Sequence, residues 1–160
     1  CMSKNDPRPR LTEPVEQFRR TRRALPHMQD VGGYYFTTTC TLVRRVLPDA
    51  AREEVMSAIR FLDEKKYRLF AAVVMHDHFH LIIEPLYKTT HGRYPLSEIF
   101  HSIKGYTARR IGGKVWQPEN YDHLIKDQKD FEALRRYVIM NPVEAGFVTD
   151  ASEYRWLYLP

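Results

Sequence analysis

Residues 68–84, with the sequence RLFAAVVMHDHFHLIIE, decide the fold of this chain. They contain two nearly continuous apolar runs, and runs of this length and composition are typical of buried strands. Only the short segment around His76 and Asp77 separates the two runs, and strands joined so closely lie side by side and antiparallel. The stretch therefore predicts a buried β-hairpin, with strands over 68–75 and 78–84 and a tight turn at His76-Asp77.

The chain before this hairpin predicts one strand and one helix. Aromatic and β-branched residues over 34–41 favour a strand. Residues 49–65 favour a helix with Asp49 at its N-cap. Its apolar residues recur at spacings of four and three, which places them on one helical face: Val55, Ile59 and Leu62.

After the hairpin, the sequence predicts a helix, a strand and a last helix. The first helix begins at Ser97 and ends at Gly112-Gly113, because glycine is favoured just after a helix. Residues 115–126 form the strand, and the last helix begins near Asp127 and ends at Asn141-Pro142. The order is βαββαβ plus a helix. It predicts an α+β, ferredoxin-like fold: an antiparallel sheet with helices on one face and an additional C-terminal helix.

Length and composition indicate one folded domain with a basic arm. The chain has 160 residues, of which 43% are hydrophobic and 28% charged, the balance of a globular protein. Residues 1–33 are rich in proline and arginine and hold seven Lys or Arg against four Asp or Glu. They are either a solvated tail or an arm that contacts DNA. We expect the domain over 34–150 and a short C-terminal tail over 151–160.

The charge balance and several missing signals narrow the classes of function. Lys and Arg number 25 against 20 Asp and Glu, an excess that suits a nucleic-acid partner. The two cysteines lie far apart and form no metal-binding motif. No apolar run approaches the roughly 20 residues that span a bilayer, and the Arg-rich N-terminus has no signal-peptide core. We therefore expect a cytoplasmic protein without a membrane partner.

The motif His78-Phe79-His80 is the first candidate for chemistry. Side chains alternate along a strand, so the two histidines share one face with backbones about 6.6 Å apart, close enough for both rings to bind one metal ion. Phe79 then packs on the opposite face. Burying two neutral imidazoles without partners costs free energy, and a metal ion removes that cost by using their lone pairs. The other interpretation is a pair of structural histidines with polar partners.

A tyrosine and an asparagine on the last predicted helix complete the candidate site. Tyr137 and Asn141 are four residues apart, so they lie one above the other on one helical face. The Asn141 amide oxygen suits a hard divalent ion such as Mg²⁺ or Mn²⁺, and the Tyr137 hydroxyl beside it can reach a phosphate bound to that ion. Taken singly, Tyr137 also suits core packing, and Asn141 a helix stop before Pro142.

Four motifs in this order resemble the REP-associated tyrosine transposases, which belong to the wider single-tyrosine transposase family with an HUH-type active site. The likeness runs from about Tyr34 to Val148. The motifs are Val73-Val74-Met75-His76-Asp77-His78-Phe79-His80-Leu81; Leu96-Ser97 with Ser102-Ile103-Lys104-Gly105-Tyr106-Thr107-Ala108-Arg109; Trp116-Gln117 with Tyr121-Asp122-His123; and Arg136-Tyr137 with Asn141-Pro142-Val143 and Ala145-Gly146. The chain departs from the family at His76, where proline is usual.

The resemblance implies a metal-dependent enzyme that acts on single-stranded DNA beside imperfect hairpins. In that family pattern His78 and His80 bind a divalent metal ion, Asn141 supplies the third protein ligand, and Tyr137 is the nucleophile that forms a 5′-phosphotyrosine intermediate. The chain is then a monomer or a homodimer, and the tyrosine helix serves its own histidine pair or that of a second copy. His76 is either a spectator or a neighbour that supports the ligands.

Several other residues are candidates for holding DNA. Five cations on the last two predicted helices are candidates for binding phosphates, although each also suits a solvated surface: Lys104, Arg109, Arg110, Arg135 and Arg136. Three aromatic residues are candidates for stacking on unpaired bases: Tyr106, Trp116 and Tyr121.

Two other functions remain open. One is a hairpin-DNA-binding protein that no longer cuts. The other is a metal-dependent hydrolase of small substrates, in which a metal ion activates water. For the hydrolase we look to Glu84 or Asp122 as further metal ligands.

Overall fold

The predicted hairpin forms the centre of the sheet. In a computed structural model of the chain, which describes residues 33–90 and 92–160, β2 (Tyr67–Val74) and β3 (His78–Pro85) pair antiparallel. Their turn is closed by a hydrogen bond of 2.8 Å from the backbone N–H of Met75 to the carbonyl oxygen of His78. The buried runs and the turn at 76–77 are confirmed.

Three further strands extend this hairpin into one antiparallel sheet. They are β1 (Tyr35–Cys40), β6 (Tyr121–Leu124) and β7 (Leu157–Tyr158), and the order across the sheet is β6-β1-β3-β2-β7. β1 pairs with β3 on one side and with β6 on the other. The central position of β1 and β3 is what brings residues from distant parts of the chain onto one surface.

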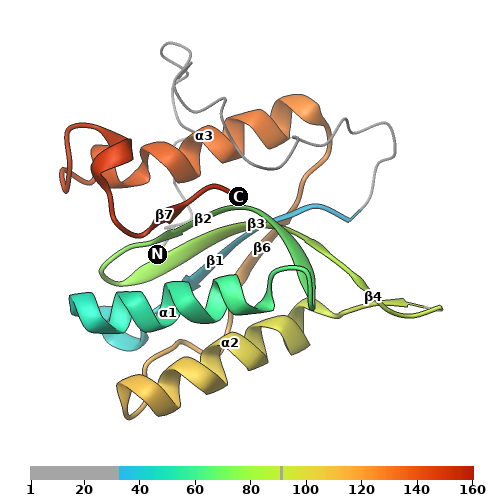
Figure 1. Cartoon of the computed structure of the whole chain (residues 1–160), viewed down its shortest axis with the longest axis horizontal. Coiled ribbons are helices and arrows are strands. Elements are labelled where there is room, and N and C mark those ends of the chain that lie inside the picture. Colours follow the sequence, from blue (N-terminus) through green and yellow to red (C-terminus); the bar gives the residue numbers. More distant parts are fainter. Residues whose placement is uncertain (1–32, 91) are drawn as a thin grey trace.

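The helices cover both faces of the sheet. Helices α1 (Asp49–Leu62) and α2 (Leu96–Ile111) lie together on one face, whereas α3 (Gln128–Glu144) lies on the other (Figure 1). The α+β class with an antiparallel sheet and an additional C-terminal helix is confirmed. Among the helices in the described residues, none combines the length and apolar character that crossing a membrane requires.

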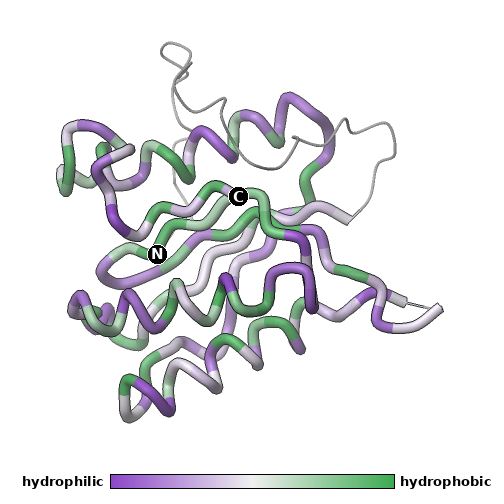
Figure 2. Tube along the Cα trace, in the orientation of Figure 1, coloured by the Kyte–Doolittle hydropathy of each residue, from purple (hydrophilic) through white to green (hydrophobic). Residues whose placement is uncertain are grey.

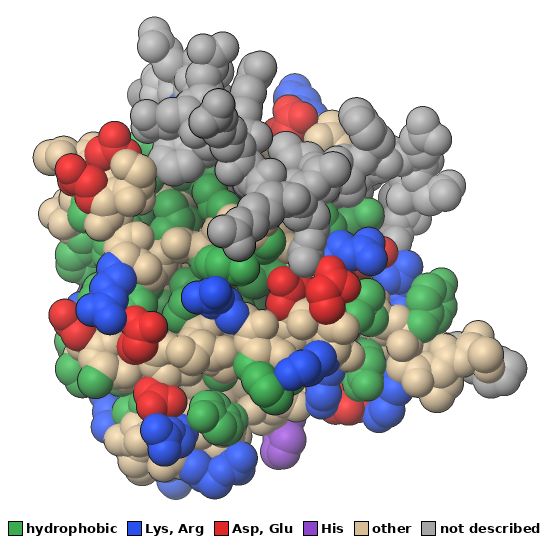
Figure 3. Space-filling view, viewed as in Figure 1, with side chains coloured by type: hydrophobic (Ala, Val, Ile, Leu, Met, Phe, Trp, Pro, Cys, Tyr) green, Lys and Arg blue, Asp and Glu red, His purple; other side chains and the backbone are tan. Residues whose placement is uncertain are grey.

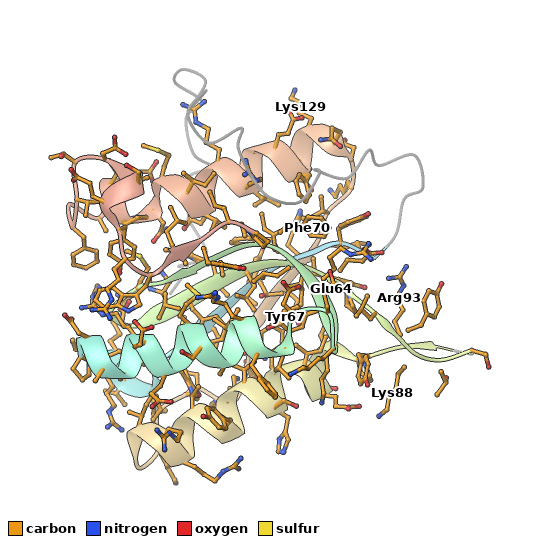
Figure 4. All side chains as sticks on the ribbon, in the orientation of Figure 1. Glu64, Tyr67, Phe70, Lys88, Arg93 and Lys129 are labelled. Atoms are coloured by element: carbon orange, nitrogen blue, oxygen red, sulfur yellow. The ribbon has the colours of Figure 1, made fainter. Side chains whose placement is uncertain are left out.

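Each face of the sheet has its own apolar contacts, which explains why apolar residues predominate in β2 and β3 (Figure 2). On the α1 and α2 face, the ring of Phe79 lies 5.2 Å from that of Trp116, and the Tyr67 hydroxyl donates to the Ile59 carbonyl of α1 at 2.6 Å. On the α3 face, the ring of Phe70 lies 5.7 Å from that of Phe131. Figure 4 shows Tyr67 beside α1 and Phe70 pointing toward α3.

The last ten residues belong to the folded structure. The short helix η3 (Ala151–Glu153) leads into β7, which pairs with β2 at Ala72 and Val73. The ring of Trp156 is buried, and Arg52 of α1 stacks over it at 3.8 Å. The segment that the sequence sets apart as a C-terminal tail therefore supplies an edge strand and part of the core.

Three short elements complete the described chain. Strands β4 (Tyr87–Thr89) and β5 (Gly92–Arg93) form a small hairpin that projects from the body, and Figure 4 shows Lys88 and Arg93 on it. The short helix η2 (Leu42–Arg44) follows β1. All but the last residue of the predicted arm over 1–33 lies outside the described residues.

Several element boundaries differ from those predicted. Helix α3 continues through Pro142 to Glu144, because proline removes only one N–H while the Asn141 carbonyl still accepts from Ala145 at 3.0 Å. The predicted strand over 115–126 is confined to β6, with Trp116 in an isolated bridge to Thr41. Helix α1 has Pro48 rather than Asp49 at its N-cap and ends at Leu62, where the Asp63 carboxylate turns to accept from the backbone of Leu69.

Candidate active site

His78 and His80 lie on the α3 face of the sheet with their rings close together. The two ring centroids are 4.7 Å apart, while Phe79 between them packs against Trp116 on the opposite face. The alternation along β3 is therefore as the sequence predicts. The two rings are near enough to share one ligand.

The ring of His80 is buried, and only one of its two nitrogens has a hydrogen-bond partner in the described residues. Thr38 of β1 places its hydroxyl oxygen 2.8 Å from Nδ1, and Phe36 stacks on the ring at 5.3 Å. Nε2 is buried and finds no hydrogen-bond partner within the described part of the chain. Burial lowers the pKa of His80 well below its usual range, and the neighbouring His78 lowers it further. The ring is thus a neutral imidazole.

His78 is oriented by the residue before it. Its Nδ1 lies 2.6 Å from a carboxylate oxygen of Asp77, whose side chain is itself buried. Burial lowers the pKa of His78, although Asp77 opposes this effect. Burial raises the pKa of Asp77, but the hydrogen bond with His78 and the charges of His78 and His76 together outweigh it, so the pKa falls below its ordinary value. Asp77 therefore accepts from Nδ1–H and leaves Nε2 of His78 as a lone-pair donor.

The histidine pair fits a metal ion. A metal-ligating histidine offers one nitrogen to the ion while a neighbouring polar group holds the other, and Thr38 and Asp77 take that part here. The buried, unpartnered Nε2 of His80 is the atom that a metal would satisfy. Within residues 33–90 and 92–160, no group of three His, Cys, Asp or Glu side chains is placed to hold a metal. A further ligand drawn from this part of the chain would therefore belong to another class, such as an amide.

Helix α3 brings Tyr137 to the same place. The helix begins at Asp127, whose side chain accepts from the Asp130 backbone at 2.8 Å, and buried apolar side chains, among them Phe131 and Val138, hold it on the sheet. The ring of Tyr137 lies 5.3 Å from that of His80 in the same chain. Asn141 is half-buried and lies one turn farther along the helix.

A row of side chains crosses the sheet beneath this helix. His80 of β3, Thr38 of β1 and Tyr121 of β6 are direct cross-strand neighbours, so all three share the α3 face. Tyr121 is 47% exposed, enough for its ring to meet an unpaired base. One row thus joins the histidine pair to an exposed aromatic ring.

Thr38 and Asp77 are site residues that sequence reasoning missed. The sequence could have indicated Asp77, since it directly precedes His78. It could not have indicated Thr38, which is the middle of three consecutive threonines, because only the pairing of β1 with β3 shows that this one lies beside His80.

The predicted phosphate-binding cations on α2 lie on the opposite face of the sheet from this site. Lys104 lies on α2 and donates to the backbone carbonyls of Gln117 at 2.8 Å and Pro118 at 3.1 Å, so it holds that segment in place, and burial lowers its pKa. Arg110 pairs with Glu54 at 2.8 Å, and Arg109 is exposed on the same helix. On α3, Arg135 is buried and Arg136 half-buried. On the face that Figure 3 shows, Lys and Arg side chains are interspersed with Asp and Glu.

The acidic residues that a hydrolase would need lie elsewhere. Glu84 occupies the far end of β3 and pairs with Arg93 at 3.0 Å. Asp122 pairs with Thr37 across the strands and so faces α2, where it lies near Lys104. His76 is 41% exposed, and its ring lies 5.2 Å from Phe147. Neither carboxylate joins the histidine pair.

The sequence and the fold are similar to those of known proteins. The chain is 26% identical over 125 residues to the REP-associated tyrosine transposase of Escherichia coli strain K12, an alignment that covers 77% of this chain and 73% of that protein. Its fold is similar to that of a REP-associated tyrosine transposase bound to a REP hairpin, with a TM-score of 0.67 and 23% identity over 84% of this chain and 81% of the other. The family model for IS200-like transposases matches residues 32–140, most of the chain. The chain therefore belongs to the family of IS200-like transposases.

Proposed function

We propose that this protein is a metal-dependent single-stranded DNA endonuclease and transposase that cleaves and rejoins DNA beside hairpin elements through a 5′-phosphotyrosine intermediate. One observation carries the proposal. The Tyr137 ring lies 5.3 Å from His80, whose buried Nε2 finds no partner in the described residues. A tyrosine that could act as the nucleophile thus lies beside a buried histidine nitrogen that could bind a metal ion. Membership of the transposase family and the hairpin bound by the similar solved protein support the choice of substrate.

Tyr137 is the residue that forms and breaks bonds. Its phenolic oxygen attacks the scissile phosphorus, the bond from phosphorus to the 3′ oxygen breaks, and the phosphate stays on the tyrosine at the 5′ end of the cut strand. The phenol loses its proton, and the departing 3′ oxygen gains one. Because the new ester conserves the energy of the broken one, a 3′-OH can attack it, release Tyr137 and make a new junction without ATP.

His78, His80 and Asn141 are the residues that would hold the metal ion, Mg²⁺ or Mn²⁺. A bound divalent ion supplies positive charge that polarises a phosphate and makes its phosphorus a better electrophile. Thr38 and Asp77 hold the two imidazoles so that Nε2 of each stays available. The ring of Tyr137 lies 5.3 Å from that of His80 in the same chain, which supports a site built within one subunit.

The first prediction tests the nucleophile. The variant Tyr137→Phe keeps the ring that packs against Phe36 and His80 but lacks the attacking oxygen. Incubated with Mn²⁺ and a labelled single strand that carries a hairpin, the wild type should form a covalent adduct that survives a denaturing gel. The variant should form none while its affinity for the DNA stays within about twofold, because the phenol contributes to chemistry rather than to gripping.

A matched control removes the same atom elsewhere. Tyr158→Phe alters a half-buried tyrosine on β7 and should leave adduct formation unchanged. An adduct formed by Tyr137→Phe would refute the assignment of the nucleophile. Tight binding without any adduct in the wild type would instead favour the hairpin-binding protein that no longer cuts, and EDTA should abolish the adduct if the metal is required.

A further inference from the structure

The loop that follows β1, residues 42–46, has a strained backbone, and burial of its side chains does not account for the strain. Val43 has φ 51° and ψ 34°, a left-handed conformation that is a clear outlier for a β-branched residue, and Arg44 also has φ 51°. Val43 is 89% exposed and Val46 is 63% exposed, so no burial of these side chains offsets the strain. Strain of this kind persists where the surroundings enforce it and is concentrated at functional sites.

Hydrogen bonds hold the loop against the segment that follows α2. The Leu42 backbone donates to the Val115 carbonyl at 2.7 Å. The Arg45 guanidinium donates to the carbonyls of Gly112 at 3.0 Å and Lys114 at 3.3 Å. These bonds fix the loop so that its two valines stand in solvent.

The same loop reaches the candidate active site. The guanidinium of Arg44 lies 3.7 Å from the carboxylate of Asp77, the residue that orients His78. The Arg44 side chain is nevertheless 69% exposed, so most of its donors face outward. A cation is thus presented beside the histidine pair.

An open cavity lies on the other side of the loop. It has a volume of about 730 Å³, and α2, Leu42 and the segment 113–118 line it. Two lysines line it: Lys114 is exposed, whereas Lys104 donates to the backbone carbonyls of Gln117 and Pro118. Among the described residues that line it none is acidic. An exposed cation beside an open cavity without carboxylates suits a ligand that carries phosphates.

We infer that loop 42–46, together with segment 112–118, binds the unpaired DNA strand that flanks the scissile phosphate. The strand leaves the histidine pair, passes Arg44 and Lys114 with its phosphates, and enters the cavity. Val43 and Val46 lie against its bases, as apolar wedges do in other DNA-binding proteins. This inference rests on the proposed function, because it takes single-stranded DNA as the substrate.

The predicted contacts of Arg44 and Lys114 with the phosphates are tested with the double variant Arg44→Ala and Lys114→Ala. Binding of a fluorescent single strand without a hairpin should weaken about tenfold at 0.1 M salt, and the slope of log affinity against log salt should fall by about 1.5, since two phosphate contacts are lost. Arg155→Ala is the matched control, because Arg155 is 68% exposed and pairs with one carboxylate, that of Glu53 at 3.2 Å. The control should bind as the wild type does.

The contact of Val43 with the bases is tested with Val43→Gly, in which affinity should fall while stability does not. Glycine adopts a positive φ without strain, so the unfolding midpoint in urea should not fall. Affinity for the same strand should drop about threefold, because an apolar contact with the bases is lost. A purely structural role for Val43 predicts that affinity stays constant.

Unchanged affinity and salt slope in all these variants would overturn the inference. That result would leave the proposed function intact as long as the wild type still forms its adduct with Tyr137. Conversely, a wild type that forms no adduct with any hairpin strand would refute the proposed function, while the binding measurements would still report on the loop.

Discussion

Thr38 and Asp77 determine which nitrogen each histidine offers. A histidine that ligates a metal needs its second nitrogen held, and loss of such a partner typically costs tenfold or more in metal affinity. Thr38 lies 2.8 Å from Nδ1 of His80, and Asp77 lies 2.6 Å from Nδ1 of His78. Under the proposed function, metal binding by His78 and His80 thus depends on two side chains that bind no substrate.

The second prediction concerns Thr38. Thr38→Val preserves the shape of the side chain but removes the hydroxyl beside Nδ1 of His80, so the affinity for Mn²⁺, measured by titration calorimetry, should fall about tenfold. Thr39→Val is the control, because Thr39 lies on the opposite face, where it bonds Asn120 at 2.9 Å. Equal affinities in the two variants would show that Thr38 does not support the metal site.

At the scale of elements, helix α3 is what brings Tyr137 to the histidine pair. Its start is fixed by the Asp127 cap, and its inner face is buried on the sheet through Phe131, Val138 and Pro142. Tyr137 lies between these anchors. The position of Tyr137 is therefore determined by the packing of the whole helix on the sheet.

The third prediction concerns the start of this helix. Asp127→Ala removes the side chain that accepts from the Asp130 backbone and should lower the free energy of unfolding by about 1 kcal/mol, measured by urea denaturation. Lys129→Ala, which changes an exposed neighbour in the same turn, should leave stability within about 0.5 kcal/mol of the wild type. A cap variant as stable as this control would mean that packing alone holds the helix start.

The fold and the site differ in how far the sequence predicts them. The central hairpin and the shared face of His78 and His80 follow from local periodicity, as does the alignment of Tyr137 with Asn141. Thr38 could not be identified, because the register between β1 and β3 is a long-range property and its neighbours are also threonines. The charge of Lys104 suggested that it binds a phosphate, but its ammonium group donates hydrogen bonds to the carbonyls of Gln117 and Pro118.

At the scale of the whole molecule, the C-terminal segment ties the sheet to α1. Strand β7 covers the edge of β2, the Trp156 carbonyl accepts from Val74 at 2.9 Å, and Arg52 of α1 stacks on the Trp156 ring. A two-residue strand has no periodicity of its own to read, so this connection was invisible in the sequence. It also protects an edge that would otherwise be open to pairing with another chain.

The fourth prediction follows from that connection. Trp156→Ala should lower the free energy of unfolding by about 3 to 5 kcal/mol, because a large buried side chain is lost and a cavity remains. Glu153→Ala, an exposed change in the same segment, should have little effect. A small loss of stability in the tryptophan variant would show that the last ten residues are dispensable for the fold.

The packing of α3 on the sheet also bears on how DNA strands would be cut and rejoined. Under the proposed function, the severed 5′ end becomes attached to a side chain on a helix that is packed on the sheet. The two DNA ends then differ, because the 5′ end is bonded to the protein and the 3′ end is not. The free 3′-OH has to reach the phosphotyrosine on α3, so which DNA ends are joined depends on which 3′-OH is brought to this helix.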